Sequence, residues 1–339
     1  MQELSVDLIE ECTRGAIDVT KEDAGIVFRR FPEKIHDYYH SQAEGTAIRA
    51  DCAAGIVIEF QTDAQKIEIA CATPDGARAF GYIDACCDGQ FVATLGNSTS
   101  CERISGQIDL TFGDDHQKYV EIYLPHCRIT ILQSLSVSDG RTVDLTDPKP
   151  VILSLGDSIT QGMNCHHPSL IYPAIYNRLS GTLMHNGGVG GDIFNVESLR
   201  ERPLESPALI TVAYGINDFN GGADASPAGP YLRRLRDLYP DTPIAVLEPT
   251  WADREGFDEN PEKNDAGITL PEYRAQLRDI VSDFDDMRCL PSNQLLPPGN
   301  FFVPDGIHPD TIGHQVMGQN VYGLIGLKKP GTRVIGSPS

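Results

Sequence analysis

The order of apolar and polar residues divides the chain into two halves with different periodicities. From about residue 45 to residue 137, apolar and polar residues mostly alternate. Clear examples are residues 56–60, 66–69, 107–110 and 128–131. Turn-forming pairs such as Asp88-Gly89 and Gly96-Asn97 separate these stretches. Many short alternating segments with this spacing predict an antiparallel β-sandwich of jelly-roll type.

In the second half, short apolar runs alternate with stretches of helical periodicity. The runs are residues 151–155, 182–185, 208–213 and 243–247. The predicted helices cover residues 172–180, 227–239, 269–287 and 310–325. The third begins at a capping box formed by Thr269 and Glu272, and its apolar residues recur at spacings of four and three as far as Met287. This alternation predicts an α/β fold with a parallel sheet covered by helices on both faces.

A breaker-rich segment separates the two patterns. It contains Asp139-Gly140 and the residues Asp147 to Pro150. We therefore expect an N-terminal β-sandwich domain over residues 1–148 and a C-terminal catalytic domain over residues 149–339. Three roles for the sandwich stay open at this point, namely binding polysaccharide, walling the active site, or making a contact in a homo-oligomer.

Composition and charge narrow the classes of partner. The 339 residues carry a formal net charge of −21, which disfavours nucleic acid and anionic membranes as partners. No apolar run reaches the length of a membrane span. The N-terminus has neither a basic segment nor an apolar one of the kind found in signal peptides, so a cytoplasmic protein is expected.

The cysteines and histidines do not follow the spacings of metal sites. None of the nine cysteines forms a C-x-x-C pair, and most lie in apolar, strand-like runs, which predicts free buried thiols. His36 and His40, like His166 and His167, are close in sequence, but there is no H-E-x-x-H motif. We therefore expect no metal and no cofactor, and we expect chelators to leave activity unchanged.

Four glycine-containing polar segments occupy the edge where an active site would form. Three follow apolar runs directly, and the fourth lies near the C-terminus; they are Gly156-Asp157-Ser158, residues 186–192, residues 214–218 and residues 305–309. In a parallel sheet, ligands bind at the carboxyl ends of the strands, so these segments are expected to converge.

Each segment supplies one role in acyl transfer. Ser158 is the candidate nucleophile, His308 the candidate base and Asp305 the residue that orients the imidazole. The backbone amides of Ser158 and Gly191 and the side-chain amide of Asn217 are candidate donors to a developing oxyanion. The alternative is structural, because Ser158 would also suit a helix N-cap and residues 305–309 would suit a turn.

Other residues at the same edge are candidate substrate contacts. They are Trp251, the only tryptophan, which follows the fourth run, together with His166 and Tyr214. Packing of Trp251 in the core and a surface position for His166 are the competing interpretations. Residues 252–268 are polar and long enough to form a wall of the pocket.

The four segments resemble the sequence blocks of the SGNH hydrolases, also called GDSL esterases and lipases. GDSI at 156–159, GGD at 190–192, GIND at 215–218 and DGIHP at 305–309 occur in the family order, with isoleucine in place of leucine at 159. The resemblance implies a flavodoxin-like three-layer α/β/α domain and metal-free ester hydrolysis. It also implies Ser158, Asp305 and His308 as the triad and Ser158, Gly191 and Asn217 as the oxyanion hole.

The predicted sandwich ahead of this domain is similar in arrangement to two-domain carbohydrate esterases and to some GDSL-type acyltransferases. We therefore expect a serine esterase that hydrolyses short-chain esters, with acetyl groups on a carbohydrate or a small molecule as the favoured substrate. One alternative is an acyltransferase that moves the acyl group to a sugar or metabolite hydroxyl. The other is an inert glycan-binding protein.

Overall fold

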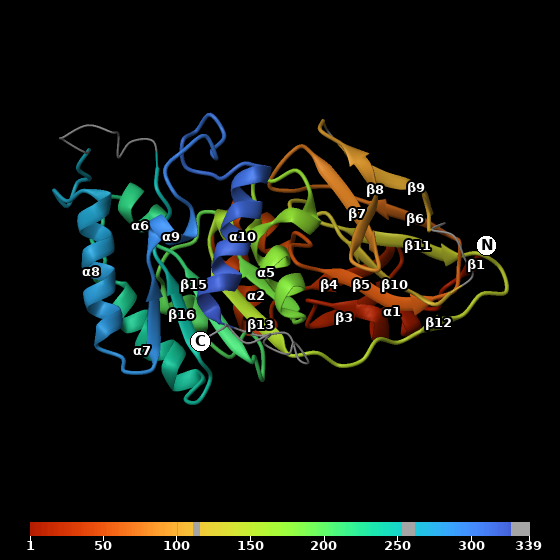
Figure 1. Ribbon diagram of the computed structural model, residues 1–339, viewed down its shortest axis with the longest axis horizontal. Coiled ribbons are helices and arrows are strands. Elements are labelled where there is room, and N and C mark those ends of the chain that lie inside the picture. Colours follow the sequence, from red (N-terminus) through yellow and green to blue (C-terminus); the bar gives the residue numbers. More distant parts are fainter. Residues whose placement is uncertain (100, 111–115, 253–261, 327–339) are drawn as a thin grey trace, which may run out of the picture.

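A computed structural model gives the fold for residues 1–99, 101–110, 116–252 and 262–326. Three sheets organise these residues, two antiparallel and one parallel. In Figure 1 the antiparallel strands lie on the right and the parallel sheet with its helices lies on the left. The expected combination of an antiparallel β-sandwich and an α/β part is confirmed.

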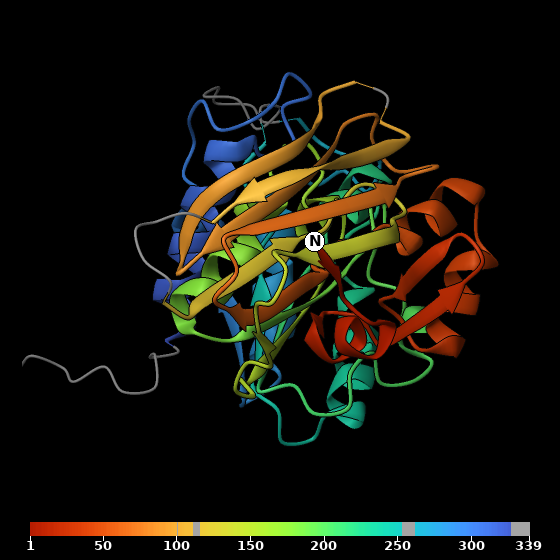
Figure 2. The same ribbon diagram turned by 90° about the vertical axis from the view of Figure 1, so that its right-hand side faces the viewer.

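The two antiparallel sheets of the N-terminal half enclose one apolar core. The first sheet has the order β3 (Asp18–Glu22), β4 (Gly25–Arg29), β11 (Ile131–Val137), β6 (Lys66–Ala72) and β9 (Arg103–Asp109), and β1 (Gln2–Glu3) also pairs with β11. The second has the order β12 (Val143–Asp144), β5 (Val57–Thr62), β10 (Lys118–Tyr123), β7 (Gly81–Cys87) and β8 (Gln90–Asn97), and β2 (Thr13–Arg14) also pairs with β5. Figure 2 shows this end of the molecule facing the viewer.

Alternation along the strands produces that core. In β6, for example, Ile67 and Ile69 are buried whereas Lys66 and Glu68 are exposed. Because successive side chains point to opposite faces of a strand, the alternating sequence gives each sheet one apolar face. All nine cysteines lie in the described residues and are free, and eight of them are buried, as expected.

The parallel sheet has the strand order of the flavodoxin-like folds. Its strands are β14 (Leu183–Gly188), β13 (Val151–Gly156), β15 (Leu209–Ala213), β16 (Ile244–Leu247) and β17 (Met287–Leu290), in that order. In chain order this is 2-1-3-4-5, which places a switch point between the first and third strands. Both neighbours of β13 are parallel to it, so the segments after β13, β14 and β15 meet at one edge.

The helices of this half join the strands and cover the sheet. They are α4 (Ser158–Gln161), η1 (Pro168–Leu170), α5 (Tyr172–Ser180), η2 (Val196–Leu199), α6 (Ile216–Asn220), α7 (Ala228–Leu238), α8 (Leu270–Ser282), α9 (Ser292–Leu295) and α10 (Thr311–Ile325). Helix α5 packs against α10, whereas α7 packs against α8 and η2. None of the described helices has the length and apolar character that a membrane crossing requires.

The prediction was wrong at the end of the third predicted helix. Helix α8 begins at the capping box of Thr269 and Glu272, as predicted, but it ends at Ser282. Met287 is the first residue of β17, the fifth strand of the sheet, which the sequence analysis did not identify. Phe284 lies between the helix and the strand, and Met287 is apolar because it is buried in the strand. Their positions happen to continue the helical spacing of four and three.

Three helices in the N-terminal half were not predicted. They are α1 (Val6–Cys12), α2 (Glu33–His40) and α3 (Glu44–Asp51). The N-cap residues of α2 and α3 are Pro32 and Ala43, neither of which caps the helix with a side-chain hydrogen bond, so the usual signal of a helix start is missing. Their apolar residues pack against Val189 of the segment after β14.

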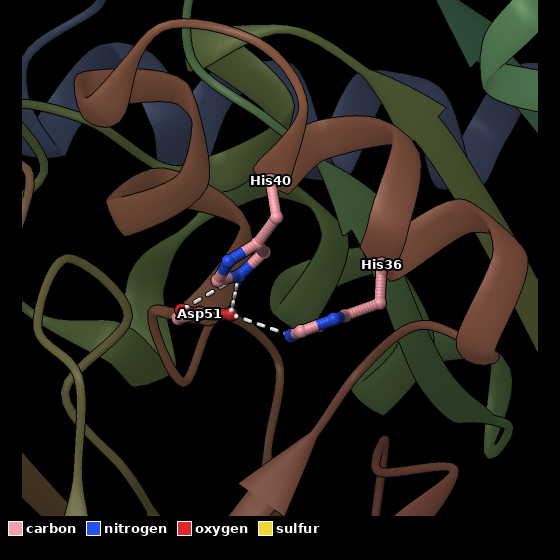
Figure 3. Close-up of side chains that lie close together, drawn as sticks. All are labelled: His36, His40 and Asp51. Atoms are coloured by element: carbon pink, nitrogen blue, oxygen red, sulfur yellow. Dashed lines mark hydrogen bonds and ion pairs between the residues drawn. The ribbon is translucent and has the colours of Figure 1, made fainter.

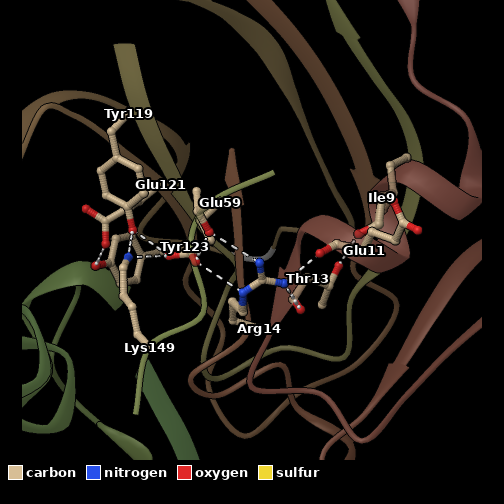
Figure 4. Close-up of polar contacts among 10 residues, drawn as sticks. Ile9, Glu11, Thr13, Arg14, Glu59, Tyr119, Glu121, Tyr123 and Lys149 are labelled. Atoms are coloured by element: carbon tan, nitrogen blue, oxygen red, sulfur yellow. Dashed lines mark hydrogen bonds and ion pairs between the residues drawn. The ribbon is translucent and has the colours of Figure 1, made fainter. Parts of the chain in front are cut away.

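The junction between the two halves is polar and hydrogen-bonded. Glu59 of β5 is 2% exposed and accepts hydrogen bonds from Arg14 Nε (3.1 Å), Thr146 Oγ1 (2.6 Å) and Lys149 Nζ (3.2 Å) (Figure 4). Burial raises the pKa of Glu59, but hydrogen bonds from Thr146 and Tyr119 and the charge of Lys149 outweigh burial, and the pKa lies below its usual value. Strands change from antiparallel to parallel between Asp144 and Val151, and the domain boundary at 148/149 stays a prediction.

Candidate active site

Ser158 lies at the turn between β13 and α4, at the carboxyl edge of the parallel sheet. Asp157 caps α4, because its side chain accepts a hydrogen bond from the backbone amide of Ile159 at 2.9 Å. Gly156 is needed directly before it, since a Cβ there would lie 2.1 Å from Thr160 Oγ1 and 2.8 Å from the carbonyl oxygen of Ala213. The helix cap is therefore Asp157, and the Ser158 side chain is left to interact elsewhere.

The side chains of Ser158, His308 and Asp305 form one continuous hydrogen-bonded chain. His308 Nε2 lies 2.7 Å from Ser158 Oγ, and His308 Nδ1 lies 2.7 Å from Asp305 Oδ2. Asp305 Oδ1 also accepts hydrogen bonds from the backbone amides of His308 and Ile307, both at 2.9 Å. Since the carboxylate accepts the Nδ1 proton, the lone pair of Nε2 faces the serine hydroxyl.

The turn around Asp305 keeps its carboxyl group ionised. Partial burial raises the pKa of Asp305, but the backbone amides of His308 and Ile307 donate to the charged form and hold the pKa below its usual value. A negative charge beside Nδ1 favours the protonated imidazole that would form when His308 accepts a proton. The side-chain amide of Asn164 also approaches Asp305 Oδ2, at 3.5 Å.

Three donors lie on segments that meet beside Ser158. Gly191 follows β14 with a φ of +84°, a left-handed conformation that favours glycine. Asn217, at the start of α6, donates from Nδ2 to the carbonyl oxygen of Asp192 at 2.9 Å, and that amide nitrogen carries a second proton. Within the described parts of the chain, the backbone amides of Ser158 and Gly191 have no hydrogen-bond acceptor.

Two arginines from the N-terminal half lie next to this site. Arg49 of α3 donates from Nη1 to the carbonyl oxygen of Gly190 at 3.0 Å, and a Cβ on Gly191 would lie 3.2 Å from the same nitrogen. Arg78 donates from Nε to Asn164 Oδ1 at 2.7 Å, and Asn164 in turn contacts Asp305. The sequence analysis missed both, because no motif marks a residue that reaches the site from another domain.

The predicted substrate contacts lie in different surroundings. His166 is exposed, and its ring meets Phe80 at a centroid distance of 5.0 Å. Trp251 is half-buried beside Phe302, with ring centroids 5.5 Å apart. Both stay candidates for substrate contact. Of the stretch predicted to form a pocket wall, residues 253–261 lie outside the described residues.

Tyr214 is placed in the core. It is 2% exposed and packs between aromatic residues of the α/β half, and its hydroxyl donates to Asp192 Oδ2 at 3.4 Å. A buried ring with this partner cannot touch a substrate at the mouth of the site. We therefore reinterpret Tyr214 as a residue that supports residues 186–192, which we call the glycine segment.

A cavity of about 510 Å³ lies away from these residues, at the junction of the two halves. Its walls include Glu59 and Tyr119 from the sandwich and Arg178 and Gln319 from the α/β half, and no residue of the Ser158–His308–Asp305 chain lines it. The candidate nucleophile therefore lies outside this cavity, with its hydroxyl 2.7 Å from an imidazole nitrogen of His308.

Three buried carboxyl groups lie beneath the site, each next to a residue of the candidate machinery. Burial raises the pKa of Asp157 to about 7, and the charges of Asp218 and Asp192 add to the effect. Burial likewise raises the pKa of Asp192 to about 7 and that of Asp218 to about 6. Tyr39 of α2 holds Asp192 by a hydrogen bond of 2.8 Å to Oδ2.

The raised pKa values of these carboxyl groups predict that the free energy of unfolding depends on pH. A raised carboxyl pKa means that the unfolded chain releases the proton first, so the free energy of unfolding falls as pH rises from about 4 to about 7. The Asp157→Asn variant removes this term and keeps the acceptor for Ile159. Its stability relative to wild type should therefore increase with pH across this window, by about 1 kcal/mol per pH unit. Urea denaturation of both proteins at pH 5, 6 and 7 measures this, and a difference that does not change with pH would refute it.

Comparisons with known proteins agree with the fold and the order of the segments. Residues 154–316 match the model of the GDSL-like lipase/acylhydrolase family. No curated protein sequence matches the chain.

Among solved structures, the salicylyl-acyltransferase SsfX3 from a tetracycline biosynthetic pathway has a TM-score of 0.76 at 20% identity, covering 93% of this chain and 96% of its own. A family two carbohydrate esterase from Cellvibrio japonicus has a TM-score of 0.61 at 14% identity, covering 96% of each chain. An acetyl xylan esterase from Butyrivibrio proteoclasticus has a TM-score of 0.56 at 14% identity, covering 80% of this chain and 88% of its own. Likeness at these identities shows the fold, including the β-rich part ahead of the α/β domain, and the expected resemblance is confirmed.

Proposed function

We propose that this chain, whose residues 154–316 form a GDSL-like lipase/acylhydrolase domain, is a serine esterase that hydrolyses short-chain esters through an acyl-enzyme. The observation that carries the proposal is the hydrogen-bonded chain from Ser158 through His308 to Asp305, with both ring nitrogens 2.7 Å from their partners. A nucleophile, its base and the residue that orients the base are thereby in mutual reach.

The reaction follows from these positions. Ser158 Oγ attacks the ester carbonyl carbon while its proton passes to His308 Nε2, and the charge of Asp305 stabilises the imidazolium. The amides of Ser158, Gly191 and Asn217 donate to the developing oxyanion, and one such donor contributes roughly 2.7–4 kcal/mol to lowering the barrier. His308 then returns the proton to the leaving alcohol. Water, deprotonated by the same imidazole, then attacks the acyl-enzyme. The bond from Ser158 Oγ to the acyl group breaks, the acid leaves, and His308 returns the proton to Oγ.

A small acyl group on a polar alcohol is the substrate class that we favour. The surroundings of the triad include Arg49, Arg78 and Asn164, whose polar groups suit hydroxyl-bearing substrates better than lipid chains. The names of two matching structures, a carbohydrate esterase and an acetyl xylan esterase, support an acetylated carbohydrate. Of the three roles left open for the sandwich, these contacts support that of a wall of the active site.

The acyltransferase alternative uses the same acyl-enzyme, and one matching structure is a salicylyl-acyltransferase. The two are separated by the fate of the acyl group when p-nitrophenyl acetate is offered with added sugars or other alcohols. We expect acetate to remain the main product, since the partly exposed triad admits water. Predominant formation of the acetylated alcohol would instead identify a transferase.

A panel of esters with different acyl lengths, together with acetylated sugars, tests the substrate class. We expect kcat/KM to be highest for acetyl esters and to fall as the acyl chain lengthens. A preference for long acyl chains would overturn the proposed class while leaving the triad in place.

A further inference from the structure

Two histidines and an aspartate of the N-terminal half converge outside the proposed active site. His36 and His40 lie one turn apart on α2, and Asp51 is the last residue of α3. The two rings stack with centroids 4.0 Å apart and planes inclined by 24°. Figure 3 shows both rings directed at the same carboxylate. We call these three side chains the His–Asp cluster.

The spacing of the polar atoms matches that of ligands around a metal ion. His36 Nε2 lies 3.2 Å from Asp51 Oδ1, and His40 Nε2 lies 3.0 Å from the same carboxylate. One potential ligand atom from each of the three residues can be chosen so that all lie within 4.8 Å of one another. Tetrahedral bonds of about 2.0–2.2 Å separate neighbouring ligand atoms by about 3.3–3.6 Å, so an ion would require only a small outward movement.

Two other imidazole–carboxylate contacts in the protein involve only one imidazole each. His116 meets Asp88 at 3.4 Å and His167 meets Asp84 at 3.1 Å, with one imidazole for each carboxylate. In the His–Asp cluster, two imidazoles present the same nitrogen, Nε2, to one carboxylate. A single hydrogen-bonded pair needs only one of these rings, whereas a shared cation uses both.

The surroundings also suit a cation. Asp37 Oδ1 lies 4.0 Å from His36 Nδ1, too far for a hydrogen bond, and adds a negative charge beside the ring nitrogen that would not bind the ion. The side chains of His36, His40 and Asp51 are 22%, 40% and 28% exposed, so an ion can enter and water can complete its coordination. The formal net charge of −21 attracts cations to the surface.

We propose that His36, His40 and Asp51 bind a divalent transition-metal ion of the zinc class, with water in the remaining positions. Two imidazoles and a carboxylate are borderline ligands of the kind that such ions prefer over magnesium or calcium. The sequence analysis expected no metal site because it found no motif with metal-ligand spacing. Asp51 lies eleven residues after His40 and reaches it through the packing of α3 against α2, so no short motif marks this cluster.

The ion would tie α2 to α3 and take no part in ester chemistry. Helix α3 also carries Arg49, which donates to Gly190, so the ion would stabilise the part of the sandwich that contacts the glycine segment. The site does not depend on the proposed esterase activity, and metal binding should be the same in the Ser158→Ala variant.

Calorimetric titration of the chelator-treated full chain with Zn²⁺ tests the proposal, with Co²⁺ and its visible absorption as a second probe. We expect one site per chain and a rise in Tm when Zn²⁺ is added. The double variant His36→Ala/His40→Ala and the variant Asp51→Asn should each bind at least tenfold more weakly. His116→Ala, which removes an exposed imidazole from a single pair with Asp88, is the matched control and should bind as wild type does.

Circular dichroism and metal-free Tm values show whether each variant folds, and His40→Gln provides a milder change if the double variant does not. Absence of Zn²⁺ binding to the wild-type chain would overturn the proposal. Equal affinity in wild type and in the folded cluster variants would overturn it as well, since the ion would then lie elsewhere.

Discussion

Replacing Ser158 with alanine should lower kcat/KM for p-nitrophenyl acetate by about 10⁴- to 10⁶-fold and leave Tm unchanged. We expect a large loss because, in the proposed mechanism, the Ser158 hydroxyl is the attacking group that forms the acyl-enzyme. The fold should tolerate the change, since Asp157 and not Ser158 caps α4. Steady-state kinetics and a thermal unfolding scan of both proteins measure the two quantities.

The histidine provides the matched control for this prediction. His308→Ala should reduce turnover to a similar level, and the double variant Ser158→Ala/His308→Ala should be no worse than either single variant, because the two residues act as one unit. Multiplicative losses in the double variant would indicate that the serine and the imidazole act independently. Unchanged turnover in Ser158→Ala would favour the glycan-binding alternative for this chain.

The second large effect is expected at Arg30. Replacing Arg30 with lysine should lower the free energy of unfolding by about 3–5 kcal/mol. Arg30 is 2% exposed and donates to five backbone carbonyl oxygens. In the N-terminal half they belong to Arg49, Ala50 and Cys52, and in the α/β half to Asn186 and Gly188, at 2.7–3.1 Å. Lysine keeps the charge but has three donors on one atom, so it leaves several of these carbonyls unsatisfied.

Urea denaturation and Tm measure this loss, which corresponds to a decrease in Tm of roughly 4–7 °C for a chain of 339 residues. Burial lowers the pKa of Arg30 to about 10, so the guanidinium stays charged at neutral pH and the comparison with lysine is a comparison of donor geometry. Arg29→Lys is the control, because Arg29 is the neighbouring arginine on β4 and is exposed. Equal stability of the Arg29→Lys and Arg30→Lys variants would show that the buried contacts contribute little.

Most strands, and the convergence of Ser158, His308 and Asp305, could be predicted from patterns in the sequence. Alternation in residues such as Ile67 and Ile69 reports which face of a strand is buried. The rule that parallel strands end at one edge brings together residues as distant in sequence as Ser158 and His308, which lie 150 positions apart. The catalytic role of this group is what the kinetic experiments must test.

The support that Arg30 and helix α3 give to residues 186–190 could not be predicted, because it depends on contacts between distant segments. Arginine is usually exposed, and nothing in the sequence distinguishes Arg30 or Arg49 from other arginines. The packing of the two halves places both side chains against residues 186–190. Strand β17 was missed for a related reason, since its four residues are too short to show a period of their own. In both cases, contacts with distant parts of the chain determine the structure, and the nearby sequence does not report them.

The most direct test of the proposed triad is the mass of the protein after brief treatment with one of two reagents. p-Nitrophenyl acetate acylates an activated serine, and a fluorophosphonate phosphonylates it. We expect one modification per chain, located by peptide mass spectrometry on Ser158, and at least a 10³-fold slower modification in the His308→Ala variant. Modification of a different residue, or modification of Ser158 at the same rate without His308, would contradict the proposed triad.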